Sequence, residues 1–281
     1  QDTGWPADHD LQTGSGLRHL GLRLAHQSGE LLITLVSSHA ALPGLKSLAE
    51  GWMARWSELR GVTLNLQPKR SNLILGTDTR LIAGCETVEE RICGQRLQLA
   101  TTTFFQVNTL QAEAIVTVLR QWFLKTLGRG RLVDAYCGVG TISLPLAAVG
   151  FDVLGIELHA SSVDQAVSNA ALNGLSPRCR FIAGDVADQL AQALPGTDAL
   201  VLDPPRRGLD QRVVKAILES PPPLLAYLSC DPATQARDLK TLMGSEGAYR
   251  LHRLQPVDFF PQTTHLESLA LLERISCGVQ P

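Results

Sequence analysis

Arg131-Leu-Val-Asp-Ala-Tyr-Cys-Gly-Val-Gly-Thr141 is the stretch that decides the fold of this 281-residue chain. Its apolar first half predicts a strand, the residues after it predict a helix, and the glycines lie in the turn between them. Gly138 and Gly140 let the backbone curl close to a ligand, where a Cβ atom would collide. Glu157 ends the next predicted strand, 19 residues after Gly138, where an acid accepts hydrogen bonds from ribose hydroxyls. These residues together predict a pocket for a cofactor that carries a nucleoside.

Strands and helices alternate on both sides of this turn. A helix that Asn108 caps and Gly128 ends comes first. We then expect strands over residues 131–136, 151–157, 180–185, 199–203 and 224–229, and helices over residues 141–149, 160–173, 186–194, 211–219 and 232–243. Such alternation gives right-handed crossovers and a parallel sheet that is covered on both faces. An antiparallel pair is expected at the end, over residues 251–259 and 268–275, so the fold class is α/β with a mostly parallel sheet.

Residues 1–95 differ from the rest and predict a smaller α+β domain ahead of a larger domain at residues 96–281. Two strands of a hairpin, one long helix and three short strands are expected over residues 17–25, 31–37, 42–59, 62–66, 73–75 and 81–83. No group of residues in this part resembles an active site.

The composition excludes several classes of protein. No apolar run is long enough to span a bilayer, so we expect no membrane partner. The six cysteines are scattered, which predicts reduced thiols in a cytoplasmic protein, and none has the spacing of a metal site. The chain begins with Gln rather than Met, so we expect that an upstream piece has been removed. No feature predicts a protein partner.

The formal net charge of −2 gives no support to wholesale nucleic-acid binding, which usually shows as a basic domain. A local basic groove remains compatible with it. The candidates for such a groove are Lys69-Arg70, Arg178 with Arg180, and Arg206-Arg207 with Arg212, although each alone is more often a solvated surface.

The acids beside the glycine-rich turn favour S-adenosylmethionine over NAD as the cofactor. The sulfonium of S-adenosylmethionine is cationic and the molecule has no pyrophosphate, so a carboxylate at Asp134 is tolerable. Ser143 only half satisfies the third small position of the dinucleotide fingerprint. Asp185 ends the third strand of the alternating region and is expected to flank the adenine, although its position equally suits a helix cap.

Cys230 follows the apolar strand 224–229, and a proline two residues later opens the next helix. Open α/β sheets place their chemistry at this edge, and the positive end of a helix favours the thiolate. A lone cysteine is more often a small buried hydrophobe, but Asp203 and Glu267 fall at the ends of neighbouring strands. Glu267 is a catalytic candidate, whereas His265 is expected to make structural hydrogen bonds.

Five motifs occur in the order typical of the S-adenosylmethionine-dependent RNA uracil-5-methyltransferases, and the chain resembles that family over residues 100–275. The motifs are Phe104-Phe-Gln-Val-Asn108, Asp134-Ala-Tyr-Cys-Gly-Val-Gly140, Asp203-Pro-Pro-Arg206, Ser229-Cys-Asp-Pro-Ala-Thr234 with Ala236-Arg-Asp238, and Phe260-Pro-Gln-Thr-Thr-His-Leu-Glu267. Residues 1–95 match only loosely, as the family's central domain. The resemblance implies a Rossmann-like class I methyltransferase domain with a seven-stranded sheet. It also implies that Cys230 is the nucleophile and that Glu267 is the base. The residues that it implies as cofactor contacts are Gln106, Tyr136, Glu157 and Asp203.

The chemistry of such an enzyme requires these residue types. Carbon 5 of uracil is a poor nucleophile until a thiolate adds to carbon 6, and Cys230 would make that bond. Glu267 would later remove the proton from carbon 5. The target base must be unstacked, so a single-stranded or looped uridine in RNA is the expected substrate. Ribosomal RNA is favoured over transfer RNA, because the central module and the Cys230 segment look more like that branch.

Two departures from the family pattern leave other functions open. Asp231 follows Cys230 where the family usually has Asn, and a carboxylate there opposes thiolate formation unless it is paired or turned away. The upstream oligonucleotide-binding barrel and the four-cysteine iron–sulfur site found in many members are not visible. The alternatives are a methyltransferase acting on an exocyclic base nitrogen, which needs no thiol, and a catalytically silent RNA-binding or assembly factor.

Overall fold

The computed structural model describes residues 3–12 and 16–275. The chain divides into two compact units. The first comprises Gln1–Arg91 and Leu97–Thr103, and the second comprises Ile92–Arg96 and Phe104–Pro281.

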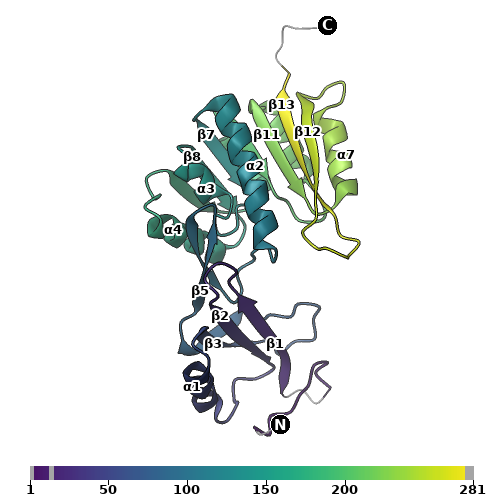
Figure 1. Cartoon of the computed structure of the whole chain (residues 1–281). Coiled ribbons are helices and arrows are strands. Elements are labelled where there is room, and N and C mark those ends of the chain that lie inside the picture. The colour runs from purple at the N-terminus through teal and green to yellow at the C-terminus, as the bar shows by residue number, and fades with distance from the viewer. Residues whose placement is uncertain (1–2, 13–15, 276–281) are drawn as a thin grey trace. The chain divides into compact units, whose positions relative to one another are not determined.

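The first unit is built on a four-stranded sheet with the order β1-β2-β3-β4 (Figure 1). Its strands are β1 (Leu17–Leu24), β2 (Leu31–Ser37), β3 (Leu59–Leu66) and β4 (Asp78–Gly84). The strands β1 and β2 form the predicted antiparallel hairpin, whereas β2 and β3 run parallel. Helix α1 (Leu45–Arg55) covers one face, where Ala49 packs against Ile33 and Val62.

Two predictions for this unit are wrong for local reasons. Residues 73–75 are no strand, because the buried amide of Gln67 donates to the carbonyl oxygens of Leu73 and Leu75 at 3.2 Å each. The carbonyl groups are therefore satisfied without a neighbouring strand. The helix predicted over residues 42–59 is shorter, because the left-handed Gly44 precedes it and the chain becomes extended at Trp56.

A hairpin that the sequence does not predict consists of β5 (Thr87–Ile92) and β6 (Gln95–Ala100). Its two turn residues, Cys93 and Gly94, have φ of 48° and 82°. Two-residue hairpin turns require such positive φ values, and Asn-Gly or Asp-Gly is their usual signal. Cys-Gly lacks the short polar side chain of that signal.

The second unit contains a seven-stranded sheet with the order β12-β13-β11-β10-β7-β8-β9. Its strands are β7 (Arg131–Ala135), β8 (Asp152–Glu157), β9 (Cys179–Ala183), β10 (Ala199–Leu202), β11 (Leu224–Ser229), β12 (Tyr249–Val257) and β13 (Glu267–Arg274). The strands β7 to β11 pair in parallel, and β13 runs antiparallel between β11 and β12 (Figure 1). The predicted α/β class with a mostly parallel seven-stranded sheet is confirmed.

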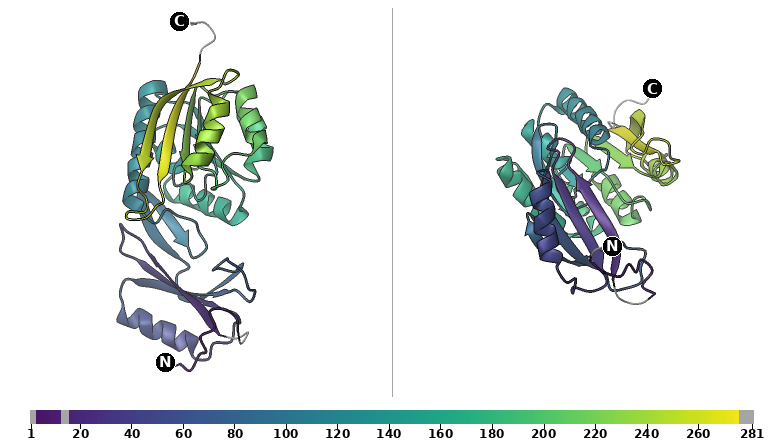
Figure 2. Two further views of the ribbon diagram at one scale, coloured as in Figure 1. Left: turned by 90° about the vertical axis from the view of Figure 1, so that its right-hand side faces the viewer. Right: turned by 60° about the horizontal axis from the view of Figure 1, so that its bottom comes forward.

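Helices cover both faces of this sheet (Figure 2). They are α2 (Thr109–Leu127), α3 (Ser143–Ala148), α4 (Ala160–Leu172), α5 (Val186–Ala193), α6 (Gln211–Glu219) and α7 (Pro232–Leu242). The predicted cap of α2 is present, since the Asn108 side chain accepts a hydrogen bond from the Gln111 N–H at 3.2 Å. Within the described part of the chain, none of the helices combines the length and the apolar composition that crossing a membrane would need.

Candidate active site

The predicted site residues gather at one edge of the seven-stranded sheet. Asp134 lies near the end of β7, beside Gly155 of β8 and Val201 of β10 in the strand register. Asp203 directly follows β10, and its backbone N–H donates to the carbonyl of Ala135 at 3.4 Å. The carboxyl ends of these parallel strands form the edge at which open α/β sheets bind ligands.

The glycine-rich turn bends sharply after β7 and is held against β8. Tyr136, Gly138 and Gly140 have φ of 69°, 54° and 90°, the left-handed region that glycine adopts without strain and tyrosine does not. The carboxylate of Glu157 fastens the turn by accepting a hydrogen bond from the Gly138 N–H at 3.2 Å. Its other oxygen accepts from the His159 N–H at 2.9 Å. Glu157 is therefore oriented by backbone donors at the mouth of β8.

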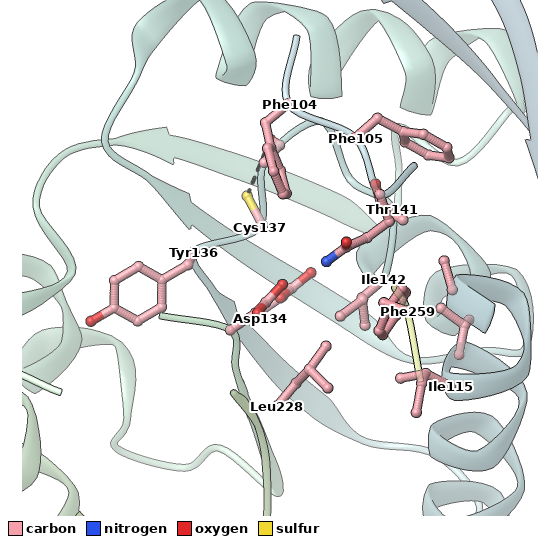
Figure 3. Close-up of a pocket in the computed structure, with 15 residues that line it drawn as sticks. Phe104, Phe105, Ile115, Asp134, Tyr136, Cys137, Thr141, Ile142, Leu228 and Phe259 are labelled. Carbon is pink, nitrogen blue, oxygen red and sulfur yellow. Dashed lines mark hydrogen bonds between the residues drawn. The ribbon is translucent and has the colours of Figure 1, made fainter. Parts of the chain in front are cut away.

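A pocket opens beside this turn. Five of the predicted site residues line it, namely Gln106, Asp134, Tyr136, Gly138 and Asp203. The remainder of the lining consists mainly of residues that the sequence did not single out, namely Phe104, Phe105, Ile115, Thr141, Ile142, Leu228 and Phe259 (Figure 3). The paired phenylalanines immediately before Gln106 are the signal that could have revealed this apolar wall. The pocket combines an apolar wall with a few convergent polar groups, as small-molecule sites do.

Asp134 is the most deeply buried acid of this pocket, with 1% of its surface exposed. One carboxylate oxygen accepts a hydrogen bond from the Ser143 hydroxyl, and the other has no protein partner. Burial raises the pKa of Asp134 to about 7, against the lowering effect of the Ser143 hydrogen bonds. A buried carboxylate oxygen without a donor costs free energy unless a ligand supplies one.

Asp185, Glu157, Cys230 and Glu267 do not line this pocket. Asp185 caps α5, since its side chain accepts a hydrogen bond from the Ala187 N–H at 2.9 Å. The alternative of a helix cap therefore describes its structural role. Its charge nevertheless helps to raise the pKa of the Tyr136 hydroxyl, after the larger effect of burial, to about 12.

Cys230 and Glu267 are brought together by the antiparallel pairing of β11 with β13. Ser229, the last residue of β11, pairs with Ser268 of β13, so Cys230 and Glu267 directly adjoin the last pair of this ladder. The two side chains are near enough for the charge of Glu267 to raise the pKa of the Cys230 thiol. Glu267 is only 4% exposed, whereas Cys230 is half-buried. The sheet thus places the predicted nucleophile and the predicted base side by side.

The electrostatics of Cys230 run against the expectation that its thiolate is favoured. Burial raises the pKa of the thiol, the charges of Glu267 and Asp203 raise it further, and Arg206 only partly opposes them. Burial also raises the pKa of Glu267. Asp203 is affected most, because burial and the charges of Glu267 and Asp134 raise its pKa to about 8. Three carboxyl groups therefore lie close together without a cation that balances them.

Asp231 does not add to this negative charge as the departure from the family pattern suggested. Its side chain is the N-cap of α7 and accepts hydrogen bonds from the backbone N–H groups of Ala233 and Thr234, at 2.9 and 3.0 Å. The Asp231 carboxylate is therefore paired with backbone donors, and a paired carboxylate is not expected to oppose ionisation of the Cys230 thiol. The groups that raise the pKa of the thiol are Glu267 and Asp203.

Helix α7 contributes two buried side chains that the sequence did not single out as site residues. Gln235 donates to the carbonyl oxygens of Tyr227 and Ser268, at 2.8 and 3.1 Å, and accepts from the Ser268 hydroxyl. Asp238 accepts from the Tyr227 hydroxyl and the Leu209 N–H, at 2.8 Å each. Gln235 thereby links the strands that carry Cys230 and Glu267, while Asp238 holds the segment that follows Asp203. Asp238 ends the Ala236-Arg-Asp238 motif, which was a signal in the sequence, whereas for Gln235 the only signal was its spacing from Asp238 on one helix turn.

His265 is exposed, its backbone N–H donates to the Thr263 hydroxyl at 3.2 Å, and its ring meets Phe260 edge to face at 6.0 Å. Among the described residues, no three His, Cys, Asp or Glu side chains are grouped in a way that could hold a metal ion.

Comparison with known proteins finds the same sequence pattern in RNA methyltransferases. An uncharacterized RNA methyltransferase of Parasynechococcus marenigrum is 60% identical over 98% of this chain, and one of Thermosynechococcus vestitus is 47% identical over 95%. The chain spans 59% of the length of each of these relatives.

A solved structure supports the same grouping. The crystal structure of Pyrococcus abyssi tRNA (uracil-54, C5)-methyltransferase, in complex with S-adenosyl-L-homocysteine, superimposes with a TM-score of 0.78 at 28% sequence identity. The match covers 91% of this chain and 59% of the Pyrococcus chain.

The family model for tRNA (uracil-5-)-methyltransferase matches residues 23–275. That range includes the glycine-rich turn, the buried acids and the Cys230–Glu267 pair. The chain is therefore a member of the tRNA (uracil-5-)-methyltransferase family, and its larger unit has the Rossmann-like class I methyltransferase fold.

Proposed function

We propose that this protein transfers a methyl group from S-adenosylmethionine to carbon 5 of a uridine in RNA, through a covalent bond to Cys230. The proximity of Cys230 and Glu267 at the end of the β11–β13 ladder, beside a pocket that is lined by Asp134 and Asp203, is the observation that carries this proposal. A methyltransferase acting on an exocyclic nitrogen would need neither a thiol nor this pairing.

The pocket fits the proposed cofactor in its chemistry and in its free space. Asp134 and Asp203 are buried acids without an ion-pair partner among the described residues, and a cationic sulfonium would complement both. Apart from Gly138 and its two chain neighbours, no atom of the described residues lies within 4 Å of the point where a Cβ atom would stand on Gly138. Gln106, Tyr136 and Asp203 would hold the cofactor with Asp134, and Glu157 and Asp185 would take its ribose and adenine. When bound, S-adenosylmethionine supplies an electrophilic methyl group.

The chain's own residues perform the remaining chemistry. Cys230 loses its proton and bonds to carbon 6 of the uracil ring, which makes carbon 5 nucleophilic. After carbon 5 has been methylated, Glu267 removes the proton from that carbon, and the bond between Cys230 and carbon 6 breaks. The raised pKa of Glu267 suits a group that must take up a proton.

The order of these steps gives a direct test. Removing the base should stop the reaction after the covalent bond has formed, so Glu267→Gln should accumulate a protein–RNA adduct in the presence of S-adenosylmethionine. The adduct should survive denaturing electrophoresis, and mass spectrometry should find the methyl group on the trapped base. Cys230→Ala, alone or combined with Glu267→Gln, should form no adduct.

Cys85→Ala is the matched control, because Cys85 is an exposed thiol outside the site. It should leave the adduct of Glu267→Gln unchanged. An adduct that persists in Cys230→Ala would remove Cys230 from the mechanism, and methyl transfer without Cys230 would favour an exocyclic nitrogen as the acceptor. Methylation that proceeds at the normal rate in Glu267→Gln would remove Glu267. Absence of cofactor binding by calorimetry would favour a silent RNA-binding factor.

The class of RNA remains a separate part of the proposal. The sequence favours ribosomal RNA, while the Pyrococcus relative is named for uridine 54 of transfer RNA. Mapping 5-methyluridine in both RNA classes, from cells with and without the gene, would decide between them. Loss of the modification from transfer RNA alone would contradict the preference for ribosomal RNA.

A further inference from the structure

A second cleft lies entirely within the first unit, at the N-terminal end of β1. It has a volume of about 750 Å³ and is lined by His9, Asp10, Gln12, Arg18, His19, Arg70, Ser71, Asn72, Leu73 and Ile74. Two arginines and two histidines therefore face a single acid, Asp10. The Lys69-Arg70 pair was one of the candidate basic grooves in the sequence, and the catalytic proposal does not use it.

Arg18 reaches this cleft because of an irregularity in β1. Neighbouring side chains of a regular strand point to opposite faces, yet Arg18 and His19 both line the cleft. The register between β1 and β2 shifts between Leu17 and His19, so Arg18 is an extra residue in the strand. Such bulges re-aim side chains and are frequent beside functional sites.

The guanidinium groups of the cleft are oriented but not neutralised. Arg18 donates to the carbonyl oxygens of Gln67, Lys69 and His9, at 2.8, 3.0 and 3.3 Å. Arg70 donates to the carbonyl of Leu11 at 3.2 Å. In the described ranges, no carboxylate lies within ion-pair distance of either arginine, whereas Arg60, Arg80 and Arg91 of the same unit each pair with an acid.

The single acid of the cleft lies beside a histidine of the cleft and not beside either arginine. Asp10 lies 3.6 Å from the Nδ1 atom of His9. The ring of His19 stands edge to face against His9 at 4.7 Å. Partial burial and the positive charges of His9 and Arg18 lower the pKa of His19, so its ring is neutral at physiological pH. A neutral imidazole can stack on an unpaired base.

We propose that this cleft binds the phosphodiester backbone of the RNA substrate, with Arg18 and Arg70 of its lining, and Lys69 next to Arg70 in the sequence, contacting phosphates. The inference rests on the proposed function for the identity of the polyanion. Leu73 and Ile74 are 70% and 58% exposed at the rim and would pack against a ribose or an unstacked base. Fixed cations beside apolar and ring surfaces are the combination that single-stranded nucleic acid requires.

The test measures how RNA affinity depends on salt concentration. This dependence would not change if the cations of the cleft had only a structural role. The probe is a fluorescein-labelled single-stranded oligouridylate, followed by anisotropy with the whole 281-residue chain over a range of salt concentrations. Each phosphate contact with single-stranded RNA contributes about 0.7 to the slope of log affinity against log salt. The double variant Lys69→Gln/Arg70→Gln should reduce the slope by up to about 1.4 and weaken binding at low salt.

Two further variants sharpen the test. Lys46→Gln is the matched control, because Lys46 is an exposed cation of α1 in the same unit, and it should leave the slope unchanged. Asp10→Asn removes the one acid that lines the cleft and should tighten binding. A slope for the double variant that equals that of Lys46→Gln would overturn the proposal. Equal affinity for uridine monophosphate and for the oligomer would overturn it too, because it indicates a small-anion site.

The outcome can be separated from that of the proposed function. Methyl transfer that occurs while the double variant binds RNA normally would refute the cleft and leave the methyltransferase intact. RNA binding that depends on the cleft, in a protein that transfers no methyl group, would support the cleft and refute the catalytic proposal.

Discussion

The thiol of Cys230 lies among acidic side chains in the free protein. Glu267 and Asp203 raise its pKa in addition to burial, and Asp134 acts on Asp203 in turn. The thiolate that the proposed reaction needs is therefore disfavoured until a positive charge enters the site. An opposite charge within about 5 Å lowers the pKa of an acid, and the proposed cofactor carries such a charge at its sulfonium.

This arrangement predicts that the cofactor's charge activates the nucleophile. S-adenosylmethionine should accelerate alkylation of Cys230 by iodoacetamide at neutral pH relative to S-adenosylhomocysteine, which has the same shape without the methyl group and its charge. The rate follows the thiolate fraction, so each unit by which the pKa falls should give about a tenfold increase. Mass spectrometry of the Cys230 peptide measures it, and the exposed Cys85 is the internal control. Equal rates with the two ligands would show that Cys230 does not sense the sulfonium.

At the scale of single residues, the sequence predicted which side chains would gather at this edge of the sheet but not their electrostatics. Asp134, Asp203 and Cys230 were predictable because each falls at or just after the carboxyl end of a parallel strand, the edge at which open α/β sheets bind ligands. Glu267 begins the antiparallel strand β13 at the same edge. The direction of the pKa change at Cys230 was not predictable. It depends on which carboxyls converge in space, and residues 203 and 267 lie far from residue 230 in the sequence.

At the scale of elements, helix α7 ties the reactive segment to the sheet. Its N-cap is Asp231, and its buried Gln235 bonds to both β11 and β13. An Asn side chain caps a helix as well as an Asp side chain does, whereas Ala costs about 1 kcal/mol. Asp231 in place of the family's usual Asn therefore preserves the N-cap of helix α7.

Two variants of Asp231 test this interpretation. Asp231→Asn should leave both the free energy of unfolding and the pH profile of Cys230 alkylation close to those of the parent protein. Asp231→Ala should lower the free energy of unfolding by about 1 kcal/mol, measured by urea denaturation. A clear fall in the pKa of Cys230 in Asp231→Asn would instead show that the capping carboxylate is felt by the thiol.

The strands of the larger unit were predicted more accurately than those of the first unit. A hydrogen-bonding side chain explains the error at residues 73–75. The central strands β10 and β11 are continuous apolar runs, because a parallel sheet is buried on both faces. All seven strands of the larger unit were expected within a few residues of their bounds. Residues 73–75 also look like a strand in sequence, but Gln67 takes up two of their carbonyl groups. A long-range contact of that kind leaves no local pattern.

At the scale of the whole molecule, the buried acids should make stability depend on pH. The pKa of Asp134 rises from 3.8 to about 7, so the folded protein holds a proton that the unfolded chain has lost between these values. The stabilising effect of that proton is complete below about pH 4 and disappears as the pH rises through 7. Asp203, with a pKa of about 8, extends the same trend to higher pH.

Asp134→Asn should therefore become more stable than the parent protein as the pH increases. The shift of about three units corresponds to a difference on the order of 4 kcal/mol between pH 4 and pH 8. The measurement is denaturant unfolding of both proteins, without cofactor, at a series of pH values. The control is Asp164→Asn, because Asp164 is exposed. Asp198→Asn would be unsuitable, since the Asp198 side chain accepts a hydrogen bond from the Arg131 N–H at the start of β7. Parallel curves for Asp134→Asn and the parent would mean that Asp134 is ionised in the folded state.

The place of β13 in the sheet has a consequence for how the protein comes into being on the ribosome. This strand is the last of the seven in chain order, yet it inserts between β11 and β12 rather than adding to an outer side. Glu267 is its first residue, so a nascent chain that has made only β7 to β11 does not yet contain the residue that we propose as the base. Under the proposed mechanism, methylation could not go to completion until β13 has been synthesised and has entered the sheet between β11 and β12.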